Sequence, residues 1–176
     1  MSKRGATGSL RTLEMQMKAV KEDERYKVHT KDDTDGFVWT ASFPSAAFYE
    51  DARDLFEDLE RFASMSNLEP NIELELHFPI QYPTSPPFVR VVRPRFQFHT
   101  GHVTIGGSIC TQQLTTQGWS SNTTVLDLLV FIHHDCFIQG EGRVDFGSYH
   151  HPNPFAIYSF AEAREAFDRV KRDHGW

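Results

Sequence analysis

The chain has 176 residues and a formal net charge of −6, with 39% hydrophobic and 24% charged residues. This length predicts one domain, and this much apolar material excludes a disordered chain. The acidic balance argues against a general nucleic-acid-binding protein. The sequence has no apolar run near the roughly 18 residues of a membrane span and no secretory signal, so we expect a cytoplasmic or nuclear protein.

Charge is unevenly distributed along the chain. Residues 1–31 carry a net charge of +4, whereas residues 32–76 carry a net charge of −10. This contrast favours an oriented surface for protein partners. The two cysteines are too few for a disulfide scaffold and indicate free thiols in a reducing compartment.

The first half of the chain predicts a helix, a hairpin and a second helix. We expect residues 1–8 to form a flexible N-terminal arm and Ser9 to cap the first helix, because apolar residues follow it at helical spacing. Residues 26–30 and 37–43 are predicted strands joined by the turn-rich DDTDG sequence. Ser45 is expected to cap a second helix with one apolar stripe and a strongly acidic opposite face.

The second half predicts two strands, an irregular stretch and two helices. Strands are expected at 71–78 and 88–92, separated by YPTSPP, whose prolines exclude regular structure. Residues 95–121 show no clear period, and a stretch this irregular inside a compact domain is usually functional or wrongly assigned. The remaining elements are a helix at 124–137, a short strand at 142–146, and a helix from 156 or 159 to about 171. This order indicates an α+β domain with an antiparallel sheet.

Cys110 is the first candidate for chemistry. It lies in GGSICTQQLTTQGWSS, where two glycines permit backbone shapes and a close approach that other residues do not. Four neighbours in sequence would favour its thiolate: Arg93, Arg95, His99 and His102. The alternative is a small buried thiol, which is the usual state of a free cysteine. The residues alone leave both readings open.

Cys136 is predicted to be a buried structural thiol. Its spacing to His133 suits one edge of a zinc site, but only His99 and His102 offer a second ligand pair, and they lack a cysteine. A Cys–His hydrolase is a further alternative, which requires a base within reach of Cys110. We expect no metal.

Three segments carry a family resemblance: HFPIQYPTSPPFVRVVRP, GGSICTQQLTTQGWSS and YSFAEAREAFDRVKRDHGW. They resemble the strands and proline turn, the active-site block and the closing helix of ubiquitin-conjugating enzymes of the Q-type branch. The resemblance covers residues 9–176 as one catalytic core domain. It implies an N-terminal helix, a four-stranded antiparallel sheet with an inserted helix, and C-terminal helices. A similar module lies beside ADP-ribosyltransferase domains in some fungal proteins, so the chain is also compatible with a module of a larger protein.

The resemblance implies that Cys110 is the nucleophile of an acyltransferase. It would accept ubiquitin as a thioester from the ubiquitin-activating enzyme and pass it to a lysine, a hydroxyl or a ligase cysteine. The implied partners are ubiquitin, the activating enzyme and a ubiquitin ligase, with no nucleic acid, membrane or cofactor. The alternative is a non-catalytic ubiquitin- or partner-binding module on the same fold.

The chain departs from the family pattern around the site. Residues 100–102 stand where ordinary members have His-Pro-Asn, whose asparagine supports the oxyanion, and the HPN at residues 151–153 is read as a coincidence. Thr84 and Ser121 replace a phenylalanine and a proline that a ligase contacts, so ligase docking there is in doubt.

Further site residues are assigned as expectations. Replacements for the oxyanion donor are His102, Gln113 and Asn122. Acids that would steer the acceptor are Glu141 and Asp145. The basic first helix would dock the activating enzyme through Arg11, Lys18 and Lys21.

Overall fold

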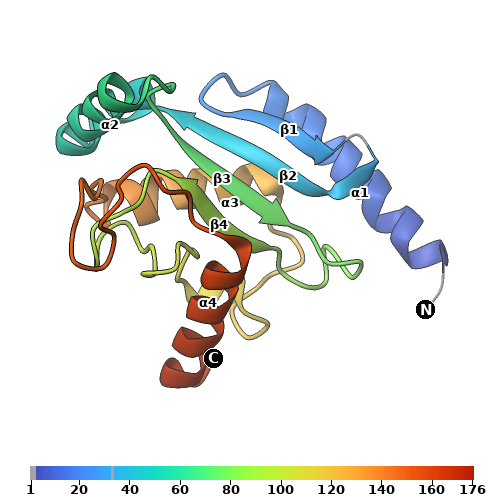
Figure 1. The fold of residues 1–176 in the computed structure, drawn as a ribbon. Coiled ribbons are helices and arrows are strands. Elements are labelled where there is room, and N and C mark those ends of the chain that lie inside the picture. The colour runs from blue at the N-terminus through green and yellow to red at the C-terminus, as the bar shows by residue number, and fades with distance from the viewer. Residues whose placement is uncertain (1–2, 33) are drawn as a thin grey trace.

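A computed structural model describes residues 3–32 and 34–176, which form the expected α+β architecture (Figure 1). The strands are β1 (Lys27–Asp32), β2 (Asp35–Pro44), β3 (Asn71–His77) and β4 (Phe88–Arg93). The α-helices are α1 (Lys3–Lys21), α2 (Arg53–Ser66), α3 (Val125–Phe131) and α4 (Phe160–His174). Shorter helical segments are η1 (Ser45–Phe48), η2 (Gln112–Leu114) and the π-helical η3 (Ile132–Ile138). No helix in the described residues is long and apolar enough to cross a membrane.

The four strands form an antiparallel sheet in the order β1-β2-β3-β4. Alternation along the strands places one set of apolar side chains on the inner face, where Trp39 pairs in register with Leu76 and Leu76 with Val89. These three side chains are at most 1% exposed. The core of the domain therefore lies on one face of the sheet.

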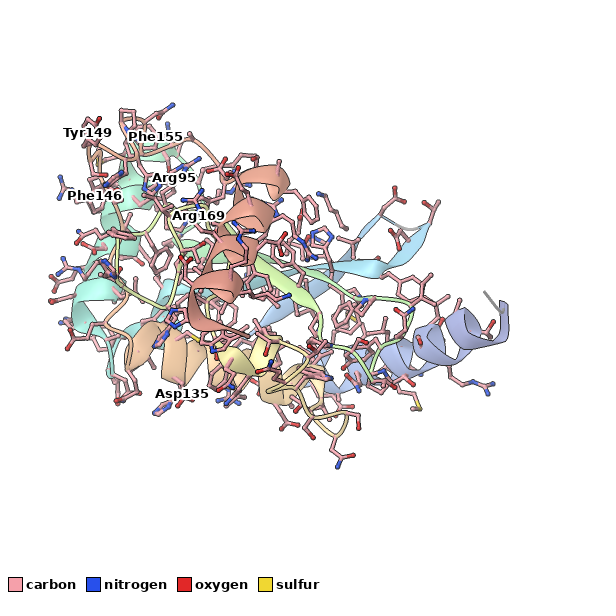
Figure 2. The ribbon with its side chains drawn as sticks, turned by 90° about the horizontal axis from the view of Figure 1, so that it is seen from below. Arg95, Asp135, Phe146, Tyr149, Phe155 and Arg169 are labelled. Atoms are coloured by element: carbon pink, nitrogen blue, oxygen red, sulfur yellow. The ribbon has the colours of Figure 1, made fainter. Side chains whose placement is uncertain are left out.

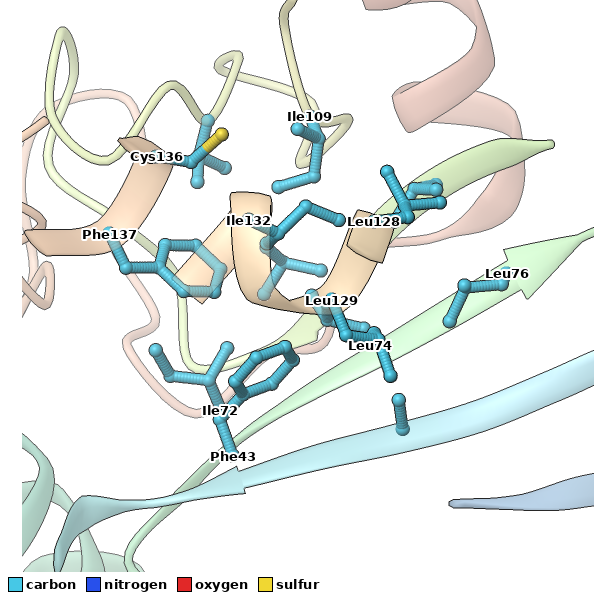
Figure 3. Packing of buried hydrophobic residues seen from close by; sticks show 14 of the residues in the cluster. Phe43, Ile72, Leu74, Leu76, Ile109, Leu128, Leu129, Ile132, Cys136 and Phe137 are labelled. Atoms are coloured by element: carbon cyan, nitrogen blue, oxygen red, sulfur yellow. The ribbon is translucent and has the colours of Figure 1, made fainter. Parts of the chain in front are cut away.

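A central helix, α3 continued by η3, covers that inner face. Thr124 begins it with a capping box: its hydroxyl accepts from the Asp127 N–H, and the Asp127 carboxylate accepts from the Thr124 N–H. Figure 3 shows Leu129 on the side of the strands, whereas Cys136 and Ile109 lie on the other side of the helix. The predicted helix over 124–137 is thus present, with a wider π turn in its second half.

The N-terminal prediction is wrong in detail. We expected a flexible arm over residues 1–8 and a cap at Ser9, but α1 begins at Lys3; residues 1 and 2 lie outside the described part. The Ser9 hydroxyl lies 2.7 Å from the carbonyl oxygens of both Ile80 and Tyr82. Ser9 therefore fastens α1 to the proline turn instead of starting the helix.

The inserted helix also begins later than expected. Ser45 opens only the short η1 segment, and α2 starts at Arg53 after Ala52. The Ser45 N–H donates to the Pro70 carbonyl, which joins the two ends of the insertion, and its hydroxyl donates to Glu60 within α2. The predicted apolar stripe is still buried, with Leu55, Leu59 and Phe62 at 2% exposure or less.

Two C-terminal expectations have different outcomes. The short strand predicted at 142–146 reduces to one bridge between Phe96 and Val144. The last helix begins where one of the two predicted starts placed it, because Ser159 forms a capping box with Glu162. It extends to His174, a few residues beyond the predicted end.

A buried ion-pair network on the outer face of the sheet holds the segment that leads into α4. Glu75 accepts hydrogen bonds from Arg90 at 2.7 and 3.0 Å and also pairs with His77 and Lys31. Burial acts to raise the pKa of Glu75, but these partners outweigh it and lower the pKa to about 2. Arg90 in turn donates to the Tyr158 carbonyl at 2.6 Å, just before α4.

We expect Glu75→Gln to lower the free energy of unfolding by about 3–5 kcal/mol, because it leaves the buried Arg90 charge uncompensated. The matched control is Glu73→Gln, which removes the more exposed Glu73–Arg93 pair and should cost less than about 1 kcal/mol. Urea denaturation measures both. Folding lowers the pKa of Glu75. The stability that its carboxylate contributes should therefore be fully present above the ordinary pKa of a glutamate and be lost as the pH falls towards about 2. Equal losses in the two variants would contradict this account.

Candidate active site

Cys110 ends a short hairpin that occupies the predicted irregular stretch. Its N–H donates to the His102 carbonyl at 2.7 Å, and Val103 and Ile109 form the next bridge. Thr104 N–H donates to the Ser108 carbonyl at 2.9 Å, which closes the turn. The thiol-bearing residue is therefore held by backbone rungs from its own hairpin.

The two glycines before Cys110 let the tip of this hairpin pack against the C-terminal segment. A Cβ at Gly107, whose φ is +94°, would lie 2.3 Å from the Tyr158 ring. A Cβ at Gly106 would lie 2.2 Å from the Glu162 carbonyl in α4. The close approach expected from the glycine pair is thus made by the chain itself.

Cys110 opens onto a groove of about 610 Å³. Its walls are the segment that leads into the hairpin, the end of the central helix and one side of α4. Side chains able to hydrogen-bond or titrate line it: His99, His102, Gln139, Glu141, Arg169 and Asp173.

The segment that replaces His-Pro-Asn forms one wall of this groove. His99, Gly101 and His102 all have positive φ, and Gly101 N–H donates to the Gly140 carbonyl at 2.7 Å. A Cβ at Gly140 would lie 2.7 Å from the His102 ring, so the missing side chain at this glycine leaves room for the imidazole. The wall is therefore fastened to the end of the central helix.

The structure favours the thiol form of Cys110, whereas its basic neighbours in sequence had led us to expect a stabilised thiolate. Cys110 is half-buried, and burial raises the pKa of its thiol above the ordinary value. Arg93 binds Glu73 at 2.8 Å, and Arg95 binds Glu162 at 2.8 Å. Because carboxylates already occupy both arginines, the expectation that they stabilise the thiolate is wrong.

The predicted support residues separate in space. His102 and Glu141 line the groove with Cys110. Gln113 and Asn122 are exposed and are not among the groove-lining residues. Asp145 is 4% exposed, and its carboxylate pairs with Gly147, Ser148 and His151, so the structure does not support an acceptor-steering role for it.

Of the polar groove residues named above, sequence reasoning missed three: Gln139, Arg169 and Asp173. Gln139 directly follows the central helix, and Arg169 and Asp173 belong to α4. These residues come together only in the folded protein, and no motif or spacing in the sequence predicts it.

The expected docking residues lie on the surface, and their partners remain predictions. Arg11, Lys18 and Lys21 are exposed on α1, and Thr84 and Ser121 are exposed in loops. Trp119 packs the loop after the active-site hairpin, as expected, because its ring N–H donates to the Pro83 carbonyl at 2.7 Å.

The alternatives of a zinc site and a hydrolase find no support in the described residues. His133 uses one ring nitrogen on the Tyr26 hydroxyl and the other on the Ala47 carbonyl, and Cys136 is 1% exposed in the core. Residues 3–32 and 34–176 contain no group of His, Cys, Asp and Glu that could hold a metal. Within the same residues Cys110 meets a histidine only through the backbone, at the His102 carbonyl, and no imidazole hydrogen-bonds to its thiol, the contact that a Cys–His dyad needs.

Comparisons with known proteins point to one family. A family model described as "Ubiquitin-conjugating enzyme" matches residues 69–134, which contain Cys110. A solved structure of human ubiquitin-conjugating enzyme E2 G1 is similar in fold, with a TM-score of 0.52 and 20% identity, over 71% of this chain and 90% of that one.

Curated relatives point to the same family. Ubiquitin-conjugating enzyme E2 25 of Caenorhabditis elegans is 33% identical over 69% of this chain and 30% of its own length. Ubiquitin-conjugating enzyme E2 Q1 of Homo sapiens is 34% identical over 60% of this chain and 24% of its own length. The chain thus spans less than a third of these relatives. By these matches and its fold, it belongs to the ubiquitin-conjugating enzyme family, in the Q-type branch.

Proposed function

We propose that this domain carries ubiquitin as a thioester on Cys110 and transfers it to lysine or hydroxyl acceptors. The observation that carries the proposal is the contrast between the two cysteines. Cys110 is half-buried on the groove within the family match, whereas Cys136 is enclosed in the core. The pKa of Cys136 is raised to about 12 by burial, so it stays a protonated thiol.

The reaction is acyl transfer in two steps. The Cys110 thiolate attacks the carbonyl that joins ubiquitin's C-terminal glycine to the activating enzyme; a new C–S bond forms and the activating enzyme's thiolate leaves. An acceptor amine or hydroxyl then attacks the Cys110 thioester, loses its proton and releases the Cys110 thiolate. Each step passes through a tetrahedral oxyanion that fixed donors must stabilise.

The groove supplies candidates for these roles. His102 pairs with Cys110 through the backbone and lines the same groove, so its ring is the candidate donor to the oxyanion, whereas Gln113 and Asn122 are not among the groove-lining residues. Glu141 and Asp173 are acids on the groove, and we assign Glu141 to orient or deprotonate an acceptor. The exposed basic residues of α1 would dock the activating enzyme, in the cytoplasm or nucleus.

The raised pKa of Cys110 fits a cysteine that is activated only in a complex. At neutral pH the free protein holds mostly the thiol, which is a weak nucleophile. Docking of the charged activating enzyme would then have to supply the proton acceptor. The same thiol state also suits the second candidate function, a non-catalytic ubiquitin-binding module.

A charging assay separates the two functions. Activating enzyme, ATP and ubiquitin should produce a thiol-sensitive adduct, visible on a non-reducing gel, that Cys110→Ala abolishes. Cys136→Ala is the matched control and should keep the adduct. Ubiquitin binding without an adduct would favour the non-catalytic module.

The thiol chemistry predicts a pH profile for the free protein. Because burial raises the pKa of Cys110, its rate of alkylation by iodoacetamide should keep rising with pH beyond the point where an unstructured cysteine peptide levels off. Mass spectrometry of the Cys110 peptide measures this rate. A plateau near neutral pH would mean that a positive group stabilises the thiolate after all.

Acceptor choice is tested on the charged domain. Free lysine, serine and threonine are added in turn, and loss of the thioester is followed by intact mass. We expect Glu141→Gln to slow discharge by about 10²-fold for whichever acceptor reacts, the lower end of general-base effects. An unchanged rate would remove Glu141 from the site.

A further inference from the structure

A buried histidine–aspartate pair lies beside the active-site hairpin and has no part in the acyl transfer described above. His151 and Asp145 are each 4% exposed. His151 Nδ1 lies 3.0 Å from Asp145 Oδ2, and its Nε2 lies 2.9 Å from the Ile105 carbonyl oxygen. One imidazole therefore joins a carboxylate to the hairpin that ends in Cys110.

Ile105 is at the tip of that hairpin, next to the glycine pair. Between the tip and Cys110 the two arms are tied by Thr104–Ser108 and His102–Cys110 backbone bonds. The Thr104 and Ser108 hydroxyls add a further contact at 2.7 Å. These rungs connect the tip of the hairpin to Cys110.

The aspartate holds the imidazole in one orientation. Asp145 accepts from the Gly147 N–H at 3.0 Å and the Ser148 hydroxyl at 2.6 Å, and its own N–H donates to the Arg95 carbonyl at 2.8 Å. Ser148 Oγ accepts from the His151 N–H at 3.2 Å. These hydrogen bonds hold the imidazole in place, with its Nε2 facing the Ile105 carbonyl.

The residues just before His151 are exposed to solvent. Figure 2 shows Tyr149 and Phe155 at the edge of the molecule near α2, and Tyr149 is 96% exposed. His150, next in sequence, is also exposed. His151 is thus the buried polar side chain through which this loop reaches the hairpin.

We propose that His151 is a positioning residue: its Nδ1–H donates to the Asp145 carboxylate, its Nε2–H donates to the Ile105 carbonyl, and the two bonds fix the hairpin that presents Cys110. Its catalytic consequence rests on the proposed function. The HPN at residues 151–153 then has a use of its own, unrelated to oxyanion support.

Two amide variants separate the two ends of the imidazole. His151→Gln places an amide N–H near the position of Nε2 and should keep the bond to Ile105. His151→Asn places its N–H near the position of Nδ1 and should keep only the bond to Asp145. His150→Asn is the matched control on the neighbouring exposed residue.

The first readout is hydrogen exchange of the hairpin amides of Thr104, Gly107 and Cys110. We expect His151→Asn to speed exchange by about tenfold, the effect of losing roughly one hydrogen bond, while His151→Gln and His150→Asn stay within about twofold. The alkylation rate of Cys110 and the single-turnover rate of ubiquitin charging should change in the same variant. Both exchange and alkylation use the free protein alone.

The outcomes are distinct. The proposal is wrong if His151→Asn leaves exchange of the hairpin amides unchanged. It is also wrong if the Asn and Gln variants change exchange equally and lose equal thermal stability. If His151→Asn loosens the hairpin but the wild-type protein never forms a thioester, the proposed function is wrong and the positioning role of His151 is still supported. If His151→Asn does not fold, Asp145→Asn takes its place: it should loosen the same amides, and wild-type exchange there would equally overturn the proposal.

Discussion

The position of Cys110 depends on the contact between two glycines and the C-terminal segment. Because Gly106 and Gly107 carry no side chain, the hairpin tip packs directly against Tyr158 and the first turn of α4. Tyr158 is itself placed by Arg90 and by the hydrogen bond from the Phe96 N–H to its hydroxyl. The sheet, α4 and the thiol-bearing hairpin are thereby joined at one point.

This packing has a chemical consequence for the thiol. The same burial that fixes Cys110 raises its pKa, and the nearby arginines are already paired with carboxylates. The site is therefore ordered but not activated in the free protein. A cysteine held as the thiol reacts slowly with electrophiles, since the thiolate is the nucleophile.

Much of the fold could be predicted from local patterns. The alternation in β3, the apolar stripe of α2 and the capping box at Ser159 each encode their element within a few residues. The role of Ser9 could not, because its hydroxyl partners lie about 70 positions away in the proline turn. The site followed the same rule: Cys110 carries a local motif, whereas Asp173 reaches the groove only through the tertiary fold.

The central claim is that Cys110 is the residue that receives ubiquitin. Intact-mass analysis after incubation with activating enzyme, ATP and ubiquitin, followed by peptide mapping without reducing agent, tests it most directly. The account predicts one added ubiquitin, released by thiol and located on Cys110. An uncharged protein, or ubiquitin found on Cys136, would contradict it.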